Sequence, residues 1–126
     1  MDFKLELVPI PVTDVDRAKA FYADQAGFTV DLDQSFGEDF RVVQLTPPGS
    51  ACSICVGKGI VDTPPGSVKG LHLVVADIHA ARAELVARGV EVSEVQDLSA
   101  PGKPTVSYAY FEDPDGNTWA LQQLPY

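Results

Sequence analysis

The chain contains an internal repeat whose period is half its length. The segment LVPIPVTDVDRAKAFYADQAGFTV, which starts at Leu7, aligns with GLHLVVADIHAARAELVARGVEV, which starts at Gly70. Asp14 and Asp77 occupy equivalent positions, so the offset is 77 − 14 = 63 residues in a chain of 126 residues. This period is far longer than that of a solenoid repeat. It predicts two copies of one supersecondary unit.

Each copy is predicted to fold with the same order of elements. An alternating strand, at residues 5–12 or 71–75, leads to Asp14 or Asp77, which suit the N-cap position of an amphipathic helix. The helices are expected at residues 15–26 and 78–88, and Gly27 or Gly89 would end each one in a left-handed conformation. Three β-rich stretches follow each glycine, at residues 28–32, 40–45 and 51–56 in the first copy and at 90–95, 106–111 and 118–123 in the second.

This order of elements predicts an α+β fold made of two βαβββ modules. The modules cover residues 1–61 and 67–126, and the Pro/Gly-rich segment DTPPGS joins them. With 126 residues and 45% apolar content, the chain has the size and composition of one globular domain, residues 1–126.

The charge of the chain argues against two classes of partner. There are 18 acidic and 9 basic residues, and the formal charge of −9 repels the phosphates of nucleic acids and anionic lipid surfaces. The segment MDFKLELVPI lacks the pattern of a signal peptide or a membrane span. We therefore expect a cytoplasmic protein that binds neither nucleic acid nor membrane, and whose charge would attract a cationic small molecule.

The two cysteines form a CSIC motif that could indicate a redox or zinc site. Cys52 and Cys55 lie in a predicted strand, however, where positions three apart face opposite sides of the sheet. Their sulfur atoms then cannot share a metal ion or form a relaxed disulfide. We interpret both residues as small apolar side chains of a sheet.

Strand alternation predicts which side chains face away from the helices. In the first strand the helix requires the apolar side formed by Val8 and Ile10, so Leu7 and Pro9 face the concave side of the sheet. In the last hairpin, Phe111 pairs with Trp119 under the helix. The residues expected to line a ligand cavity are Leu7, Pro9, Phe40, Val42, Gln44, Ser53, His72, Val74, Tyr108, Tyr110, Ala120 and Gln122.

Several motifs of the chain resemble those of a known family. The pattern V-x-D-[VI]-x-x-A occurs at residues 12–18 and 75–81, AFY-x-x-x-x-GF occurs at residues 20–28, and DPDGN precedes the last strand. Together they resemble the vicinal oxygen chelate superfamily, which includes glyoxalase I, bleomycin resistance proteins and extradiol dioxygenases. The resemblance covers nearly the whole chain. It implies that the modules form a curved, partly open mixed sheet around a shared cavity, usually completed by a second chain in a dimer.

The resemblance also implies where a metal ion would bind. Metal enzymes of this superfamily use His, Glu or Gln side chains on the first and last strands of each half. The equivalent positions in this chain are Leu7, Ser53, Gly70 and Ala120. Three of these residues have no donor atom, and a single serine hydroxyl binds divalent ions weakly. We therefore predict neither metal nor cofactor, as in the metal-free members of the superfamily, most of which sequester antibiotics.

Two main hypotheses about function remain open. The first is a homodimeric binding protein, whose ligand is a hydrophobic or cationic small molecule such as an antibiotic, held with the help of stacking by Tyr108 and Tyr110. The second is an enzyme: an isomerase or lyase that uses His72 as a general base and Tyr110 as an electrophile, or a metal-dependent lyase or dioxygenase whose ligands lie in a shifted register.

The same residues can also have purely structural roles. His72 can instead serve only to hydrogen-bond a neighbouring carbonyl or tyrosine, and His79 is expected to be solvated on its helix. Alternating tyrosines are ordinary sheet residues. The domain can also be a regulatory module with a vestigial cavity.

Overall fold

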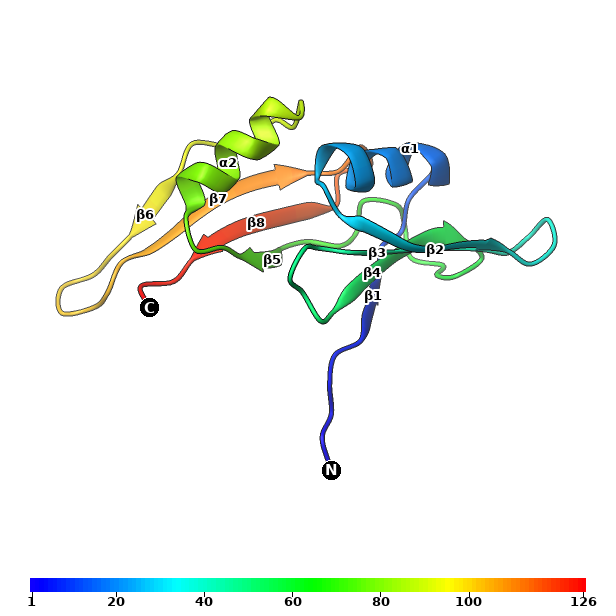
Figure 1. The fold of residues 1–126 in the computed structure, drawn as a ribbon, viewed down its shortest axis with the longest axis horizontal. Helices are drawn as coiled ribbons and strands as arrows, with labels where there is room; N and C mark the ends of the chain where they lie inside the picture. The colour runs from blue at the N-terminus through cyan, green and yellow to red at the C-terminus, as the bar shows by residue number, and fades with distance from the viewer. The chain divides into compact units, whose positions relative to one another are not determined.

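The computed structural model describes residues 1–126, which form two compact units (Figure 1). The first unit comprises Met1–Val68 and Asp113–Asn117, and the second comprises Lys69–Glu112 and Thr118–Tyr126. Each unit has a four-stranded mixed sheet with one helical segment against it. The predicted α+β class and the order βαβββ in each half are therefore confirmed. No helix is long and apolar enough to cross a membrane.

The first unit contains six elements. They are β1 (Leu7–Pro9), α1 (Val15–Ala20), the π-helical turn η1 (Phe21–Gln25), β2 (Thr29–Ser35), β3 (Arg41–Thr46) and β4 (Ser53–Lys58). The sheet order is β1-β4-β3-β2, in which β1 is parallel to β4 and the other neighbours are antiparallel. Strand β1 thus lies at one edge of this sheet.

The second unit repeats this topology. Its elements are β5 (Leu71–Val74), α2 (Ile78–Ala87), β6 (Gln96–Leu98), β7 (Val106–Glu112) and β8 (Thr118–Gln123). The sheet order is β5-β8-β7-β6, with β5 parallel to β8. The predicted pairings of Phe111 with Trp119 and of Ala109 with Leu121 are both present. All four residues are buried on the side of the sheet that α2 covers.

Both helices begin as the sequence predicts. The side chains of Asp14 and Asp77 accept hydrogen bonds from the backbone N–H groups of Arg17 and Ala80, at 3.0 and 3.1 Å. The first helix differs from the second at its end, where the backbone N–H of Ala26 donates to the carbonyl of Phe21, five residues earlier, at 2.8 Å. This spacing is that of a π-helix.

Two predicted strands differ most from the observed ones, and the others differ by no more than three residues at their ends. No strand covers residues 90–95, because Arg82 donates hydrogen bonds to the carbonyls of Val92 and Ser93, and the Ser93 hydroxyl accepts the backbone N–H of Tyr110. These bonds occupy groups that a regular ladder would use, and pairing resumes only in β6. The first strand covers Leu7–Pro9 rather than residues 5–12, and its late start follows from β4, which begins only at Ser53, beside Leu7.

A network of buried polar groups anchors the turn DPDGN, residues 113–117, in the first unit. Asp113 accepts hydrogen bonds from the Tyr22 hydroxyl at 2.7 Å, from the side-chain amide of Asn117 at 2.8 Å, and from the backbone N–H groups of Asp115 and Asn117 at 2.9 and 3.0 Å. The same Asn117 amide donates to the carbonyl of Pro11 at 2.9 Å. The turn is thereby fixed to the chain that leaves β1.

Gly66 approaches this turn closely. Its φ is +81°, and a Cβ atom added at Gly66 would lie 2.3 Å from the carbonyl oxygen of Asp115. Only glycine fits this position without a shift of the backbone. The segment between the two halves is therefore packed against the turn.

A charged network crosses from α1 to the sheet of the first unit. Arg41 binds both carboxylate oxygens of Asp33, at 2.8 and 3.0 Å, and also binds Asp16 at 2.9 Å, while Lys19 binds Asp33 at 2.8 Å. Hydrogen bonds from Arg41 and Lys19 hold the pKa of Asp33 well below its ordinary value, and Asp33 raises the pKa of Arg41.

We expect the Tyr22→Phe substitution to lower the free energy of unfolding by roughly 1–3 kcal/mol, because it removes a donor to the buried Asp113 carboxylate. Urea denaturation measures the effect. The matched control is Tyr126→Phe, whose hydroxyl belongs to a side chain that is 97% exposed. Equal stability of the two variants would contradict the anchoring role of this bond.

We expect Asp33→Asn to lower the free energy of unfolding at pH 7 by about 1 kcal/mol, since the paired carboxylate is only partly shielded from solvent. Folding lowers the pKa of Asp33, so the stabilisation by its carboxylate is complete at any pH above the ordinary pKa of an aspartate. This stabilisation is lost as the pH falls through the lowered pKa. The difference in free energy of unfolding between Asp33→Asn and wild type should therefore become smaller only in strong acid. The exposed Asp62, changed to Asn, is the control.

Candidate ligand-binding faces

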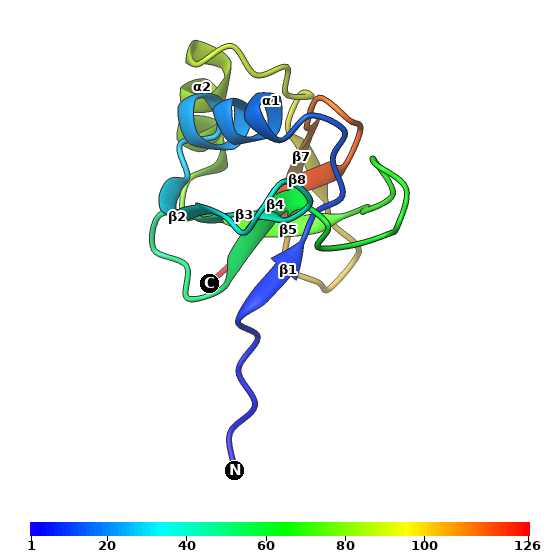
Figure 2. The ribbon, with the colours of Figure 1, turned by 90° about the vertical axis from the view of Figure 1, so that its right-hand side faces the viewer.

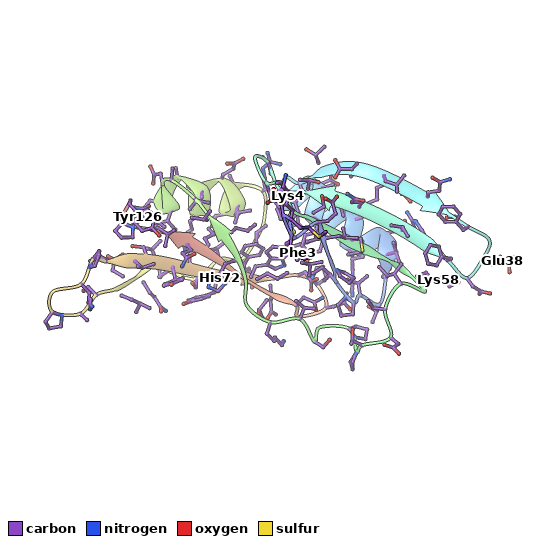
Figure 3. The ribbon with its side chains drawn as sticks, turned by 90° about the horizontal axis from the view of Figure 1, so that it is seen from below. Phe3, Lys4, Glu38, Lys58, His72 and Tyr126 are labelled. Atoms are coloured by element: carbon purple, nitrogen blue, oxygen red, sulfur yellow. The ribbon has the colours of Figure 1, made fainter.

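One face of the second sheet presents an aromatic and polar surface on the side opposite α2. Strand register places His72 beside Ala120 and Ala120 beside Tyr110, so these three residues form one row across β5, β8 and β7. The next row consists of Val74, Gln122 and Tyr108, followed by Gln96 on β6. We call these two rows the aromatic face. Figure 3 looks onto this side and labels His72.

The rings on the aromatic face are ordered by contacts with one another. Tyr108 and Tyr110 are nearly parallel, with an interplanar angle of 5° and ring centroids 6.2 Å apart. His72 meets Tyr108 edge-on, at a centroid distance of 6.0 Å. The side-chain amide of Gln122 donates to the Tyr108 hydroxyl at 3.0 Å. These contacts restrict the rotamers of the aromatic side chains in both rows of the aromatic face.

His72 makes one polar contact that determines the tautomer of its neutral ring. Its Nδ1 lies 2.7 Å from the carbonyl oxygen of Gly70. A carbonyl oxygen can only accept, so the hydrogen of this bond belongs to Nδ1, and the neutral ring carries its lone pair on Nε2. The residue is exposed, and this second nitrogen can accept a proton or a hydrogen bond from a ligand.

The corresponding face of the first sheet is more aliphatic. Leu7 lies beside Ser53, and Pro9, Cys55 and Gln44 form the next row, across β1, β4 and β3. Register places Val42 in the following row, beside Gly57. Phe40 precedes β3, and its ring packs against Phe36 at a centroid distance of 5.6 Å. We call these residues of β1, β3 and β4 the aliphatic face.

The polar atoms of the aliphatic face bond mainly to each other. The hydroxyl groups of Ser53 and Thr46 lie 2.6 Å apart, and Thr46 also donates to Asp31. Cys52 and Cys55 are free thiols, and burial raises the pKa of Cys55. The Cys55 thiol is therefore protonated at neutral pH and acts as an apolar group.

A model of the Glyoxalase/Bleomycin resistance protein/Dioxygenase superfamily matches residues 4–121. The chain belongs to this superfamily. The match covers nearly all of both halves, in agreement with the resemblance seen in the motifs.

Three solved members of the superfamily or its fold illustrate the relationship. TnmS3, an antibiotic binding protein from Streptomyces sp. CB03234, is 34% identical, with 97% of this chain and 96% of that chain covered and a TM-score of 0.78. A glyoxalase/bleomycin resistance protein from the same strain is 35% identical, with 95% and 100% covered and a TM-score of 0.75. A superfamily member from Sphaerobacter thermophilus DSM 20745 is 27% identical, with 98% of each chain covered and a TM-score of 0.79. The comparison with curated proteins found no match.

The residues at the expected metal positions of the superfamily do not fit a divalent ion. Leu7, Gly70 and Ala120 have no side-chain donor atom, and the hydroxyl of Ser53 is bonded to Thr46. No group of three or more His, Cys, Asp or Glu side chains lies close enough together to hold a metal ion. We therefore derive no chemical step through a metal at these positions.

Sequence reasoning did not assign two residues that register places on the aliphatic face. Leu32 lies beside Gln44, and Thr46 contacts Ser53 on the same side. The register of β2 shifts between Val30 and Leu32, which is a β-bulge and breaks simple alternation. The Thr46 position could have been found by extending the third predicted strand by one residue, whereas nothing in the sequence marks the bulge.

We expect nitrogen-15 NMR of labelled histidine to show His72 as the Nδ1–H tautomer above the pH range in which histidines titrate, because Gly70 accepts that hydrogen. His79, for which no such bond is present, should show a mixture of tautomers. Finding His72 as the Nε2–H tautomer would contradict this geometry and would remove the free lone pair from Nε2.

Proposed function

We propose that the chain is a small-molecule-binding protein that holds a hydrophobic or cationic ligand, of the antibiotic type, without a metal ion. The single observation that carries the proposal is the row His72, Ala120, Tyr110. Its centre, where the metal enzymes of the superfamily have a ligand residue, is a buried methyl group that is 1% exposed. The methyl group offers no donor atom to a cation, and the rings of His72 and Tyr110 on either side of it favour contact with a flat apolar molecule.

The chemistry of both faces supports this type of ligand. The aliphatic face offers Leu7, Pro9 and Val42, and the aromatic face offers two parallel tyrosine rings on which an aromatic or cationic group can stack. Each face also has a few hydrogen-bonding groups that would orient a ligand bound to that face: Gln44 on the first sheet, and Gln122 and His72 on the second. A surface that is largely apolar with few polar groups is typical of small-molecule sites.

The similarity to TnmS3 supports the same proposal. That protein is an antibiotic binding protein, and it is 34% identical over 97% of this chain. A relative of this identity and coverage makes antibiotics the first ligand class to test. A formal charge of −9 would in addition favour the approach of cationic molecules.

A thermal-shift screen of antibiotics, flavonoids and acyl metabolites tests the proposal, since a ligand that binds only the folded state raises the Tm. For a compound that binds, we expect Tyr108→Ala and Tyr110→Ala each to weaken binding by about tenfold, the loss of one stacking contact. Tyr126→Ala, remote from any ring contact, is the control.

Two results would contradict the proposal of a metal-free binding protein. One is the absence of any stabilising compound in the panel. The other is stoichiometric metal in protein purified without chelator. A matched pair of flat probes, one neutral and one cationic, separates the two ligand types, because only binding of the cationic probe should weaken as salt is added.

The geometry of His72 favours one alternative function. Its Nε2 lone pair is free, the side chain is exposed, and Tyr110 lies two positions away in the same row. These groups suit an isomerase or lyase in which His72 removes a proton and a tyrosine hydroxyl polarises the substrate. Turnover of an acyl metabolite that His72→Ala abolishes, while binding persists, would favour the enzyme. Binding without turnover would favour the receptor.

A further inference from the structure

An unpaired carboxylate lies at one end of the aromatic face. Glu112 is the last residue of β7, and strand alternation places its side chain on the same side of the sheet as Tyr108 and Tyr110. The residue is exposed, and its carboxylate takes part in no ion pair or hydrogen bond of the structure. Figures 1 and 2 show α2 along the other side of this sheet, so the helix of the second unit leaves Glu112 uncovered.

Glu112 is the only charged side chain that strand register places on this side of β5, β6, β7 and β8. The other acidic residue of these strands, Asp97, accepts a hydrogen bond from Ser107 on the side that α2 covers. Within the row of Glu112, the Thr118 hydroxyl accepts the backbone N–H of Gly70 at 2.8 Å. A Cβ atom added at Gly70 would meet no atom within 4 Å. This end of the face is therefore open, and its charge is negative.

The opposite end of the face is apolar. Register pairs Val106 of β7 with Leu98 of β6 in the row beyond Tyr108, and Leu98 is 55% exposed. Along β7 the side chains on this face are thus Val106, Tyr108, Tyr110 and Glu112, at intervals of about 7 Å. Their order runs from an aliphatic group through two aromatic rings to a carboxylate. A ligand that lies along β7 would therefore meet different chemistry at its two ends.

We propose that the aromatic face selects a ligand with a flat apolar body and a protonated amine at one end, and that Glu112 binds the amine. This inference rests on the proposed function, which it narrows to one class of ligand and one orientation. A cation paired with Glu112 can also lie within about 6 Å of the centre of the Tyr110 ring, whose face attracts it. The carboxylate and the ring therefore act on the same charge.

A single carboxylate suits an ammonium group better than a metal ion or an anion. A divalent ion requires several donor atoms, and no group of three or more His, Cys, Asp or Glu side chains could hold one. An anionic end group would be repelled by Glu112. Because an exposed ion pair contributes little free energy by itself, the tyrosine rings supply most of the affinity, and Glu112 supplies the preference for an amine and the orientation of the ligand.

Naphthalene probes that share one flat body and differ in their end group test this inference by calorimetry. They are 2-naphthylmethylammonium, 2-naphthylmethanol and 2-naphthylacetate, compared at about pH 8, where imidazoles are neutral and a primary amine is protonated. We expect the ammonium probe to bind wild type most tightly. Glu112→Gln should weaken its binding roughly three- to tenfold and change that of the methanol probe by less than about twofold.

The matched control is Glu84→Gln, which removes the same charge from α2, on the other side of the sheet, and should change neither affinity. Glu112→Lys should reverse the preference, so that 2-naphthylacetate binds more tightly than the ammonium probe. Tyr110→Ala should weaken the binding of all the probes, since its ring contacts their common body. Circular dichroism of each variant checks that the fold is intact.

The outcomes separate this inference from the proposed function. Equal affinities of wild type for the ammonium and methanol probes, or an equal effect of Glu112→Gln on both, would overturn the role of Glu112 and leave a receptor for flat neutral molecules. A loss of ammonium binding in Glu112→Gln with no effect of Tyr110→Ala would also overturn it, because the amine would then bind outside the aromatic face. Failure of the proposed function is recognised separately, by a panel of compounds in which none raises the Tm.

Discussion

The buried carboxylate of Asp113 organises the first unit. A carboxylate at this depth is costly unless several donors surround it, and here a tyrosine hydroxyl, a side-chain amide and two backbone N–H groups do so. The Asn117 amide extends the network to the carbonyl of Pro11. Since β8 begins directly after this turn, the position of the turn determines which residues of β8 face the helix and which face the opposite side. The motif DPDGN is therefore structural in this chain, and it sets the register of β8.

That register has a chemical consequence. Turning Trp119 and Leu121 toward α2 leaves Ala120 between His72 and Tyr110 on the opposite side. A longer side chain with an oxygen or nitrogen donor at position 120 would offer a ligand to a cation, whereas a methyl group leaves the neighbouring rings as the main contact surface. Together with Leu7, Ser53 and Gly70, position 120 is one of four at which the side chains present do not suit the chelation of a cation.

Much of the fold could be predicted because its signals are local. The two N-cap aspartates and the alternation of β7 and β8 each depend on neighbouring residues, and the predicted strand at residues 118–123 is observed without change. Errors arose where distant groups decide the backbone. The bonds from Arg82 that displace β6, and the bulge that brings Leu32 beside Gln44, depend on contacts across the fold that spacing does not reveal. For the candidate faces, alternation predicts that His72 and Tyr108 share one side of the sheet, whereas their edge-on contact and the bond of His72 to Gly70 are seen only in the structure.

The π-helical turn η1 accounts for a difference in length between the two halves. The helix-starting aspartate and the helix-ending glycine are separated by 27 − 14 = 13 positions in the first half and by 89 − 77 = 12 in the second. A π-turn is the usual way in which a helix absorbs one additional residue without rotating the flanking faces. The extra position in the first half is thus taken up within Phe21–Gln25, and Ala18 and Tyr22 remain buried. The two halves thus differ by one residue between the aspartate and the glycine, and η1 accommodates that residue while Tyr22 and Leu85, each eight residues after its aspartate, are both buried.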